Sequence, residues 1–138
     1  MLVVDAGCLF EIVAGTPQAE PLRERLAADQ DWAAPHLVDV EVYSVIRQKH
    51  RAGRLDRTAA AQAVEDLADW PGERFAHRTF LARAWQLRDN VRGWDAIYVA
   101  LAEALDAVLL TTDGRLMRAE GPRCSIEWFA PSGGDAVC

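Results

Sequence analysis

Short apolar runs alternate with amphipathic segments along this chain. Residues 2–4 and 108–110 are continuous apolar runs, the pattern of strands that are buried on both faces of a parallel sheet. Residues 32–35 form a weaker candidate closed by a proline, and further strands are expected at 74–77, along an edge, and at 125–129. Because helical segments separate these runs, the chain predicts an α/β fold with a mostly parallel sheet of about five strands.

Helical periodicity fills the segments between the strands. Residues 6–14 carry apolar side chains at helical spacing, and Thr16-Pro17 predicts the cap and first turn of a helix that continues to about residue 28. A long amphipathic helix is expected over residues 37–51. Its predicted inward stripe consists of Leu37, Val40, Ser44 and Val45. The other expected helices cover residues 56–70, 79–90, 93–102 and 114–119.

The length of 138 residues suits one domain, expected over residues 1–130 and followed by a disordered tail at 131–138. A composition of 51% hydrophobic and 26% charged residues is that of a globular protein. The first residues lack the pattern of a signal peptide, and no uncharged run approaches the roughly 18 residues of a membrane span. The sequence therefore predicts a cytoplasmic protein without a membrane anchor.

Charge and cysteine content restrict the kinds of site further. The formal net charge is −6, so general electrostatic attraction to nucleic acid is absent and any such contact must be local and assisted by cations. Three cysteines without a paired CxxC spacing argue against a disulfide framework and against a zinc site. Cys8 and Cys124 are interpreted as small buried residues.

Four acidic residues are expected at one edge of the sheet. Asp5 and Asp113 follow predicted strands, and Asp95 begins the apolar helix at 93–102. Glu41 falls on the inward stripe of its helix. Since ligands of open α/β sheets bind beyond the carboxyl ends of the strands, these four side chains are candidates for a common site.

Each aspartate also has an ordinary interpretation as a helix cap or first-turn acid, whereas Glu41 lies within a helix that offers it no unpaired backbone N–H. Jointly the acids conflict, because two carboxylates about 4 Å apart repel by roughly 4 kcal/mol at a dielectric constant of about 20. A hard divalent cation such as Mg²⁺ or Mn²⁺ removes that conflict. Such a site can activate water and stabilise a reacting phosphate, which points to phosphodiester hydrolysis.

The acidic segments resemble the four motifs of PIN-domain nucleases, in particular the VapC-like toxins of bacterial toxin–antitoxin pairs. The resemblance extends from Leu2 to about Phe129. The segments that carry it are Leu2-Val3-Val4-Asp5-Ala6, the helix of Glu41 after Ala34-Pro35, Trp94 to Ala102, and Leu110 to Leu116. It implies a three-layer α/β/α fold of the PIN type.

The resemblance also implies an activity and partners. It implies a Mg²⁺- or Mn²⁺-dependent endoribonuclease that acts as a toxin, a homodimer, and a small, DNA-binding antitoxin whose peptide covers the acidic cleft. The implied catalytic and metal-binding residues are Asp5, Glu41, Asp95 and Asp113, with Thr112 as a supporting hydroxyl. The chain departs from the family pattern at three positions: Gly7 replaces a frequent Ser or Thr, Arg115 replaces an acid present in some members, and Trp94 replaces a frequent Tyr. The first two differences bear on metal affinity and stoichiometry.

Two sets of basic residues are candidates for contacts with RNA. Arg88 and Arg92 lie just before Asp95 in the sequence and are preferred. A basic run between residues 47 and 57 could bind phosphates, but cations at the end of a helix also have a purely structural explanation. Four tryptophans are assigned to the core or to interfaces: Trp32, Trp70, Trp85 and Trp128.

Two other functions remain as alternatives. A PIN-like domain could bind RNA or protein without cutting it. A receiver-like phosphoacceptor domain also places acids at strand ends, but its chemistry uses a lysine after a late strand, and the only lysine here is Lys49 in an early helix. Phosphate-binding glycine motifs are absent, which disfavours a nucleotide-binding module.

Overall fold

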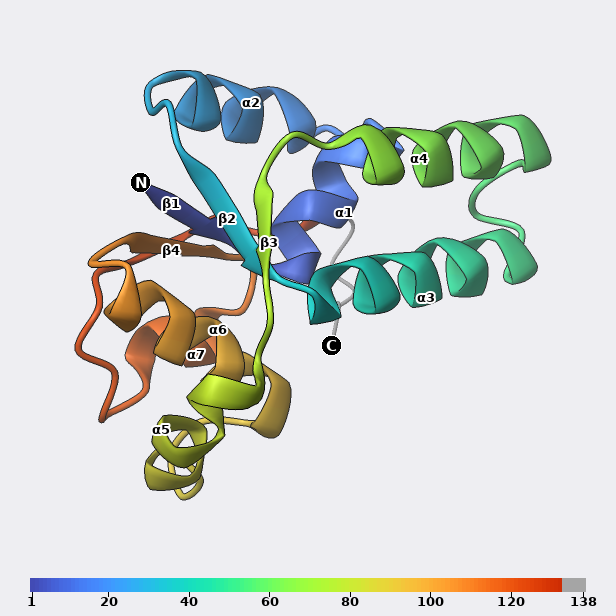
Figure 1. The fold of residues 1–138 in the computed structure, drawn as a ribbon. Helices are drawn as coiled ribbons and strands as arrows, with labels where there is room; N and C mark the ends of the chain where they lie inside the picture. The colour runs from blue at the N-terminus through green and yellow to red at the C-terminus, as the bar shows by residue number, and fades with distance from the viewer. Residues whose placement is uncertain (133–138) are drawn as a thin grey trace.

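Five short parallel strands form the centre of the fold in the computed structural model, which describes residues 1–132 (Figure 1). The strands are β1 (Leu2–Val4), β2 (Trp32–Pro35), β3 (Glu73–Phe75), β4 (Val108–Thr111) and β5 (Ile126–Trp128). They are ordered β3-β2-β1-β4-β5, and Val3 pairs with Ala33 on one side and with Leu109 on the other. The predicted α/β class and parallel sheet are confirmed, including the position of β3 at an edge.

Helices cover both faces of this sheet, as predicted (Figure 1). The helices are α1 (Ala6–Ala14), α2 (Ala19–Ala27), α3 (Leu37–Arg51), α4 (Arg57–Asp69), α5 (Leu81–Gln86), α6 (Gly93–Ala104) and α7 (Gly114–Arg118). Helices α1 to α4 pack against one another on one face, and α6 packs against β1, β2 and β4 on the other with α5 outside it. Within residues 1–132, no helix has the length and apolar character needed to cross a membrane.

The most apolar segments meet in the core. The side chains of β1 are fully buried, and α6 buries a continuous series from Ala96 to Ala102. The sheet is covered on both faces, which explains why its central strands are continuously apolar rather than alternating. The core therefore fixes the two segments that bear Asp5 and Asp95.

Helix α1 has the predicted bounds and sharp ends. The carboxylate of Asp5 accepts the backbone N–H of Cys8 at 2.8 Å and caps the first turn. Gly15 ends the helix in the left-handed conformation, with φ 65°, and its N–H reaches the carbonyls of Glu11 and Ile12. Helix α2 begins at Ala19, later than the predicted start at Pro17; the Thr16 hydroxyl donates to the carboxylate of Glu11 and accepts the backbone N–H of Gln18.

The inward face of α3 differs from the predicted stripe. Its buried side chains are Val38, Val42, Val45 and Ile46. Of the predicted stripe only Val45 is buried, while Val40 is 63% exposed and Ser44 is also exposed. The prediction was wrong at these two positions because a side of the helix that carries apolar residues faces an open cleft instead of the core.

Three further predictions concern the helix at 79–90, two cysteines and the C-terminal tail. The helix expected at 79–90 is shorter, since a 3₁₀ turn precedes α5 and irregular turns follow it. Cys8 is buried and Cys124 half-buried, both as free thiols. The tail expected from residue 131 falls largely on residues 133–138, which lie outside the described residues, and Ser132 is bound to Glu11.

Candidate active site

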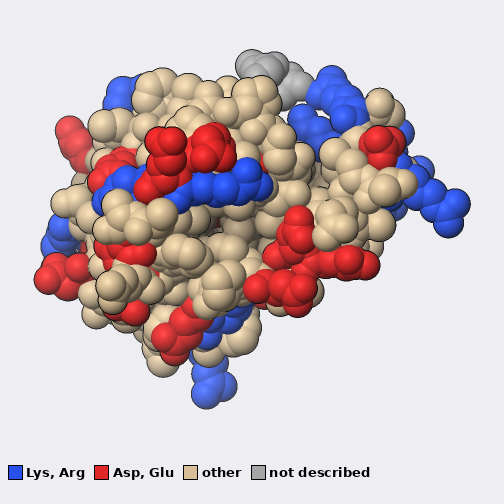
Figure 2. Space-filling model, turned by 90° about the horizontal axis from the view of Figure 1, so that it is seen from above, with Lys and Arg blue, Asp and Glu red and all other residues tan. Residues whose placement is uncertain are grey.

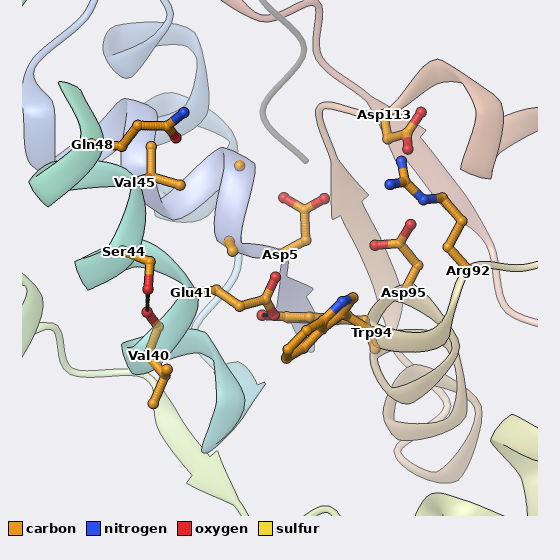
Figure 3. Close-up of a pocket in the computed structure, with 13 residues that line it drawn as sticks. Asp5, Val40, Glu41, Ser44, Val45, Gln48, Arg92, Trp94, Asp95 and Asp113 are labelled. Carbon is orange, nitrogen blue, oxygen red and sulfur yellow. Dashed lines mark hydrogen bonds between the residues drawn. The ribbon is translucent and has the colours of Figure 1, made fainter. Parts of the chain in front are cut away.

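All four predicted acids line one cleft at the carboxyl ends of β1 and β4. Asp5 and Asp113 follow these two strands, Asp95 projects from the first turn of α6, and Glu41 projects from α3 on the opposite wall. Figure 3 shows their carboxylates pointing into the same space. The cleft has a volume of about 300 Å³. The side of α3 that bears Val40 and Ser44 forms one wall.

Asp5 is the most enclosed acid of the cleft and has two roles. It caps α1 through Cys8, and the hydroxyl of Thr111 also hydrogen-bonds to its carboxylate. These contacts favour the charged form, but burial outweighs them and raises the pKa of Asp5 above its ordinary value. The structural interpretation of Asp5 as a cap is therefore correct, and it does not exclude a chemical role.

Glu41 shares its environment with a phenol. The hydroxyl of Tyr98 in α6 donates a hydrogen bond to the Glu41 carboxylate at 2.9 Å. Burial raises the pKa of Glu41 to about 7, with further increases from the charges of Asp95 and Asp5, although the hydrogen bond from Tyr98 opposes the shift. Burial also raises the pKa of Tyr98 well above its usual value, so the phenol remains protonated and acts as a donor.

Asp95 lies in the first turn of α6 without capping it. Arg92 occupies the N-cap position, and no side chain there bonds to the free N–H groups. The interpretation of Asp95 as an N-cap was therefore wrong. Burial raises the pKa of Asp95 to about 6, the charges of Asp5 and Asp113 add to this, and Arg92 and Arg115 oppose it. Its position is electrostatically costly, and a capping hydrogen bond does not compensate for that cost.

Asp113 is the acid most engaged with basic groups. It caps α7 by accepting the backbone N–H of Arg115 at 2.9 Å, and the guanidinium of Arg115 lies 3.3 Å from the same carboxylate. Arg115 thus partly neutralises this side of the cleft. Figure 3 also shows the Arg92 guanidinium between Asp113 and Asp95.

The two threonines before Asp113 have different surroundings. Thr111, which the sequence analysis missed, bonds through its hydroxyl to Asp5 and accepts the backbone N–H of Asp113 at 3.0 Å. Thr112, the predicted supporting hydroxyl, packs against Gly7, where an added Cβ would collide with its Oγ1 atom. Thr111 could have been suspected because it is a polar residue at the end of an otherwise apolar buried strand. The Thr112 hydroxyl occupies the space that a side chain at residue 7 would need.

Comparisons with known proteins identify the family of this chain. Residues 2–122 match the family model of the PIN domain. The chain belongs to the PIN-domain family. It is 41% identical over 119 residues to ribonuclease VapC3 of Mycobacterium tuberculosis, covering 86% of each chain. It is 37% identical over 126 residues to ribonuclease VapC1 of the same organism, covering 91% of this chain and 95% of that one.

Solved structures share the fold of this PIN domain at low sequence identity. A VapBC2 structure from Rickettsia felis, bound to a promoter DNA fragment, has a TM-score of 0.66 at 14% identity and covers 93% of this chain and 98% of that one. A toxin–antitoxin complex from Klebsiella pneumoniae has a TM-score of 0.64 at 19% identity, covering 94% and 99%. These matches support the three-layer architecture.

The predicted RNA-contacting arginines of this PIN domain lie in different places. Arg92 lines the cleft beside the acids. Arg88 is not among the residues that line it; its guanidinium stacks over the ring of Trp85 at 4.5 Å from the ring centre. Arg92 is therefore the one of the two that is positioned to meet a substrate phosphate in the cleft.

The basic run of α3 and α4 lies away from the acids. In Figure 2, basic side chains gather at the right-hand end, where Figure 1 places the hairpin between these helices. The exposed basic residues of this segment are Arg47, Arg51, Arg54 and Arg57. The nearest residue of α3 that lines the cleft is Gln48. The run therefore extends outward from one wall of the cleft.

The acidic side chains of the cleft are of the kind that binds a hard divalent cation, but they are not yet arranged around one. The acids offer only oxygen ligands, and no His or Cys belongs to the described lining. Within residues 1–132, no group of three potential ligands already has the arrangement of a metal site. Glu41 is held by Tyr98 and Asp113 by Arg115, so a cation would have to draw these carboxylates inward.

Proposed function

We propose that this PIN domain is an endoribonuclease that hydrolyses RNA phosphodiester bonds with Mg²⁺ or Mn²⁺ and acts as the toxin of a toxin–antitoxin pair. The observation that carries this proposal is one cleft in which burial and mutual repulsion raise the pKa values of Glu41 and Asp95. Relatives that align over most of the chain are named ribonuclease VapC, which supports RNA as the substrate class.

Some residues of the cleft would bind the cation, and others would bind the substrate. Asp5, Glu41, Asp95 and Asp113 would hold the ion. When bound, the ion would activate water and stabilise the charge that develops on the phosphate. Tyr98 orients Glu41, and Thr111 orients Asp5. Arg92 would attract the phosphate, which the bare acidic cleft would otherwise repel.

A cleavage assay with matched variants tests the activity. We expect purified protein to cut mixed cellular RNA with Mg²⁺ or Mn²⁺ and not with EDTA, and we expect Asp95→Asn to abolish cutting while the protein remains folded. The matched control is Asp66→Asn, which removes an exposed carboxylate on α4 far from the cleft. Equal cleavage in EDTA, or full activity of Asp95→Asn, would contradict the proposed chemistry.

The proposed partners are a small DNA-binding antitoxin and a second copy of the chain, in the cytoplasm. The names of the VapBC2 and toxin–antitoxin structures support an antitoxin. Coexpression with a short reading frame next to this gene should rescue cells from toxicity, and light scattering should give the mass of a dimer. Persistent toxicity in the presence of that neighbour would contradict the antitoxin proposal, and a monomer mass would contradict the dimer.

A non-cleaving PIN-like module is the alternative with some structural support, because Arg115 already neutralises part of Asp113 and the acids are not closed into a metal site. Such a module would bind RNA or protein without metal-dependent cutting, which the same assay detects. The receiver-like alternative loses its support, since Lys49 lies on α3 and does not line the cleft.

A further inference from the structure

Trp94 presents a large aromatic surface at the cleft. Its side chain is 62% exposed, although it lines the same space as the acids. It stands at the start of α6 between Arg92 and Asp95, and Figure 3 shows its indole on the side of the cleft that faces Glu41. Core packing does not account for the position of this indole, and its exposed face lies where a ligand of the cleft would be bound.

The cleft has an exposed apolar side chain on its other wall as well. On the opposite wall Val40 is 63% exposed and lines the cleft as well. An apolar side chain therefore stands on each wall, within a site whose other side chains are mainly acidic or polar.

Trp85 provides an internal comparison. It is 67% exposed, about as much as Trp94, but it lies on α5 outside the lining of the cleft, and the guanidinium of Arg88 covers its ring. In the part of the chain that the structure describes, Trp94 has neither an aromatic nor a cationic group stacked on its ring. Of these two exposed tryptophans, the one in the cleft has the uncovered face.

We propose that Trp94 is a base-stacking residue, on which an unpaired RNA base lies while the adjoining phosphate enters the cleft beside Arg92. This inference rests on RNA as the ligand in the proposed function. Any base offers a face to an aromatic ring, so stacking binds RNA with little sequence preference, and it requires a base that is not paired. Val40 limits the space for that base from the α3 side.

The test measures binding and cleavage separately on a single-stranded RNA oligonucleotide. Binding is measured in Mn²⁺ with Asp95→Asn as the background, which should not cut, and cleavage in Mn²⁺ without that change, for the full chain and for Trp94→Ala, Trp94→Phe and Trp85→Ala. We expect Trp94→Ala to raise Kd and KM by roughly 10- to 100-fold with kcat largely kept. Trp94→Phe should recover most of the loss, and Trp85→Ala should behave like the unchanged protein.

A second substrate lacks the RNA base that would stack on Trp94, so the contact is removed from the RNA side instead of the protein side. An oligonucleotide with one abasic nucleotide next to the mapped cut should bind the unchanged protein as weakly as Trp94→Ala binds the intact RNA. Combining the abasic substrate with Trp94→Ala should add little further loss, because both changes remove the same contact.

Several results would overturn the inference: no binding of RNA by the unchanged protein, unchanged Kd in Trp94→Ala, or an equal loss on intact and abasic RNA. A Trp94→Ala protein that keeps RNA binding but changes its mass in light scattering would assign the ring to a protein interface instead. Binding that depends on Trp94 without any cleavage would support the inference while contradicting the proposed nuclease activity.

Discussion

Helix α1 and its N-cap residue bear two buried carboxylates with opposite surroundings. Asp5 is 7% exposed and faces Glu41 and Asp95, whose pKa values its charge helps to raise. Glu11 is 1% exposed and is surrounded by neutral donors. The hydroxyl of Thr16 and both the N–H and the hydroxyl of Ser132 donate to its carboxylate, the latter two at 3.2 and 2.8 Å.

The difference shows that burial alone does not identify a chemical role. At Glu11 the donors match the acceptor, so this carboxylate joins α1 to the segment after β5 and has a structural function. At Asp5 a second and a third acid share the space, and local hydrogen bonds leave their repulsion in place. A cation would relieve the repulsion among the acids around Asp5, whereas the Glu11 carboxylate is already satisfied by hydrogen bonds.

The largest predicted contrast is in activity. Asp5→Asn should lower RNA cleavage by at least about 100-fold, because it removes a proposed metal ligand while keeping the shape of the side chain. Glu11→Gln should leave cleavage per folded molecule within about 3-fold, because Glu11 does not line the cleft. Initial rates of RNA cleavage in Mn²⁺ measure both. Loss of activity in Glu11→Gln at unchanged stability would remove the distinction between the two acids.

The second contrast is in stability and runs in the opposite direction. Glu11→Ala should lower the free energy of unfolding by about 2 to 3 kcal/mol, because it leaves a cavity and deprives buried donors of their acceptor. Ser132→Ala should cost about 1 kcal/mol. Urea unfolding monitored by circular dichroism measures these values. A Glu11→Ala protein as stable as the unchanged chain would show that these hydrogen bonds contribute nothing to the fold.

A third contrast appears in pH dependence without metal. The pKa values of Glu41, about 7, and Asp95, about 6, lie above their ordinary values of 4.5 and 3.8. The folded state therefore binds protons that the unfolded chain has released, and stability should fall as pH rises from about 4 to about 8 and then level off. We expect a decrease of about 2 kcal/mol between pH 5 and pH 8 in EDTA, about half of what the two pKa values give by linkage, because solvent screens these partly exposed groups.

The control for that experiment is the double variant Glu41→Gln/Asp95→Asn, which should flatten the pH profile and be more stable than the unchanged protein at pH 8. Glu11→Gln should retain the slope. A metal-free protein that is more stable at pH 8 than at pH 5 would contradict the proposed repulsion in the cleft.

The smallest effect concerns the packing beside Asp5. Gly7→Ala should cost about 1 to 2 kcal/mol, because the new Cβ would collide with the Thr112 hydroxyl. In Thr112→Ala that oxygen is absent, so adding Gly7→Ala should cost clearly less. A double-mutant cycle from urea unfolding measures the coupling. Additive effects would mean that Thr112 does not determine the requirement for glycine at residue 7.

Much of the fold followed from local patterns. Strands β1 and β4 were predictable because apolar runs of this length suit a buried parallel sheet, and the bounds of α1 because Asp5 and Gly15 are strong signals for its ends. The face of α3 was not, because Val40 is apolar and yet faces the cleft. Periodicity shows which side of a helix is apolar. Whether that side meets the core or an open cleft depends on how the other elements pack.

At the site, too, some features could be predicted from the sequence and others could not. The meeting of Asp5 and Asp113 followed from their places after parallel strands, since strand ends converge at one edge. The partners of the acids did not follow, because they are distant in sequence: Tyr98 reaches Glu41 across 57 residues, and Ser132 reaches Glu11 across 121. Glu11 itself was missed, since a single acid in an apolar helix gives no local sign of its donors.

The most direct test of the central claim is a calorimetric titration with Mn²⁺ at pH 8 of the unchanged protein, Asp95→Asn, Glu41→Gln and Glu11→Gln. The four-carboxylate cleft predicts that the unchanged protein and Glu11→Gln bind the ion alike and that each cleft variant binds it at least about 10-fold more weakly. Binding that is absent from the unchanged protein, or equal in all four proteins, would contradict the claim that the acids of the cleft share a cation.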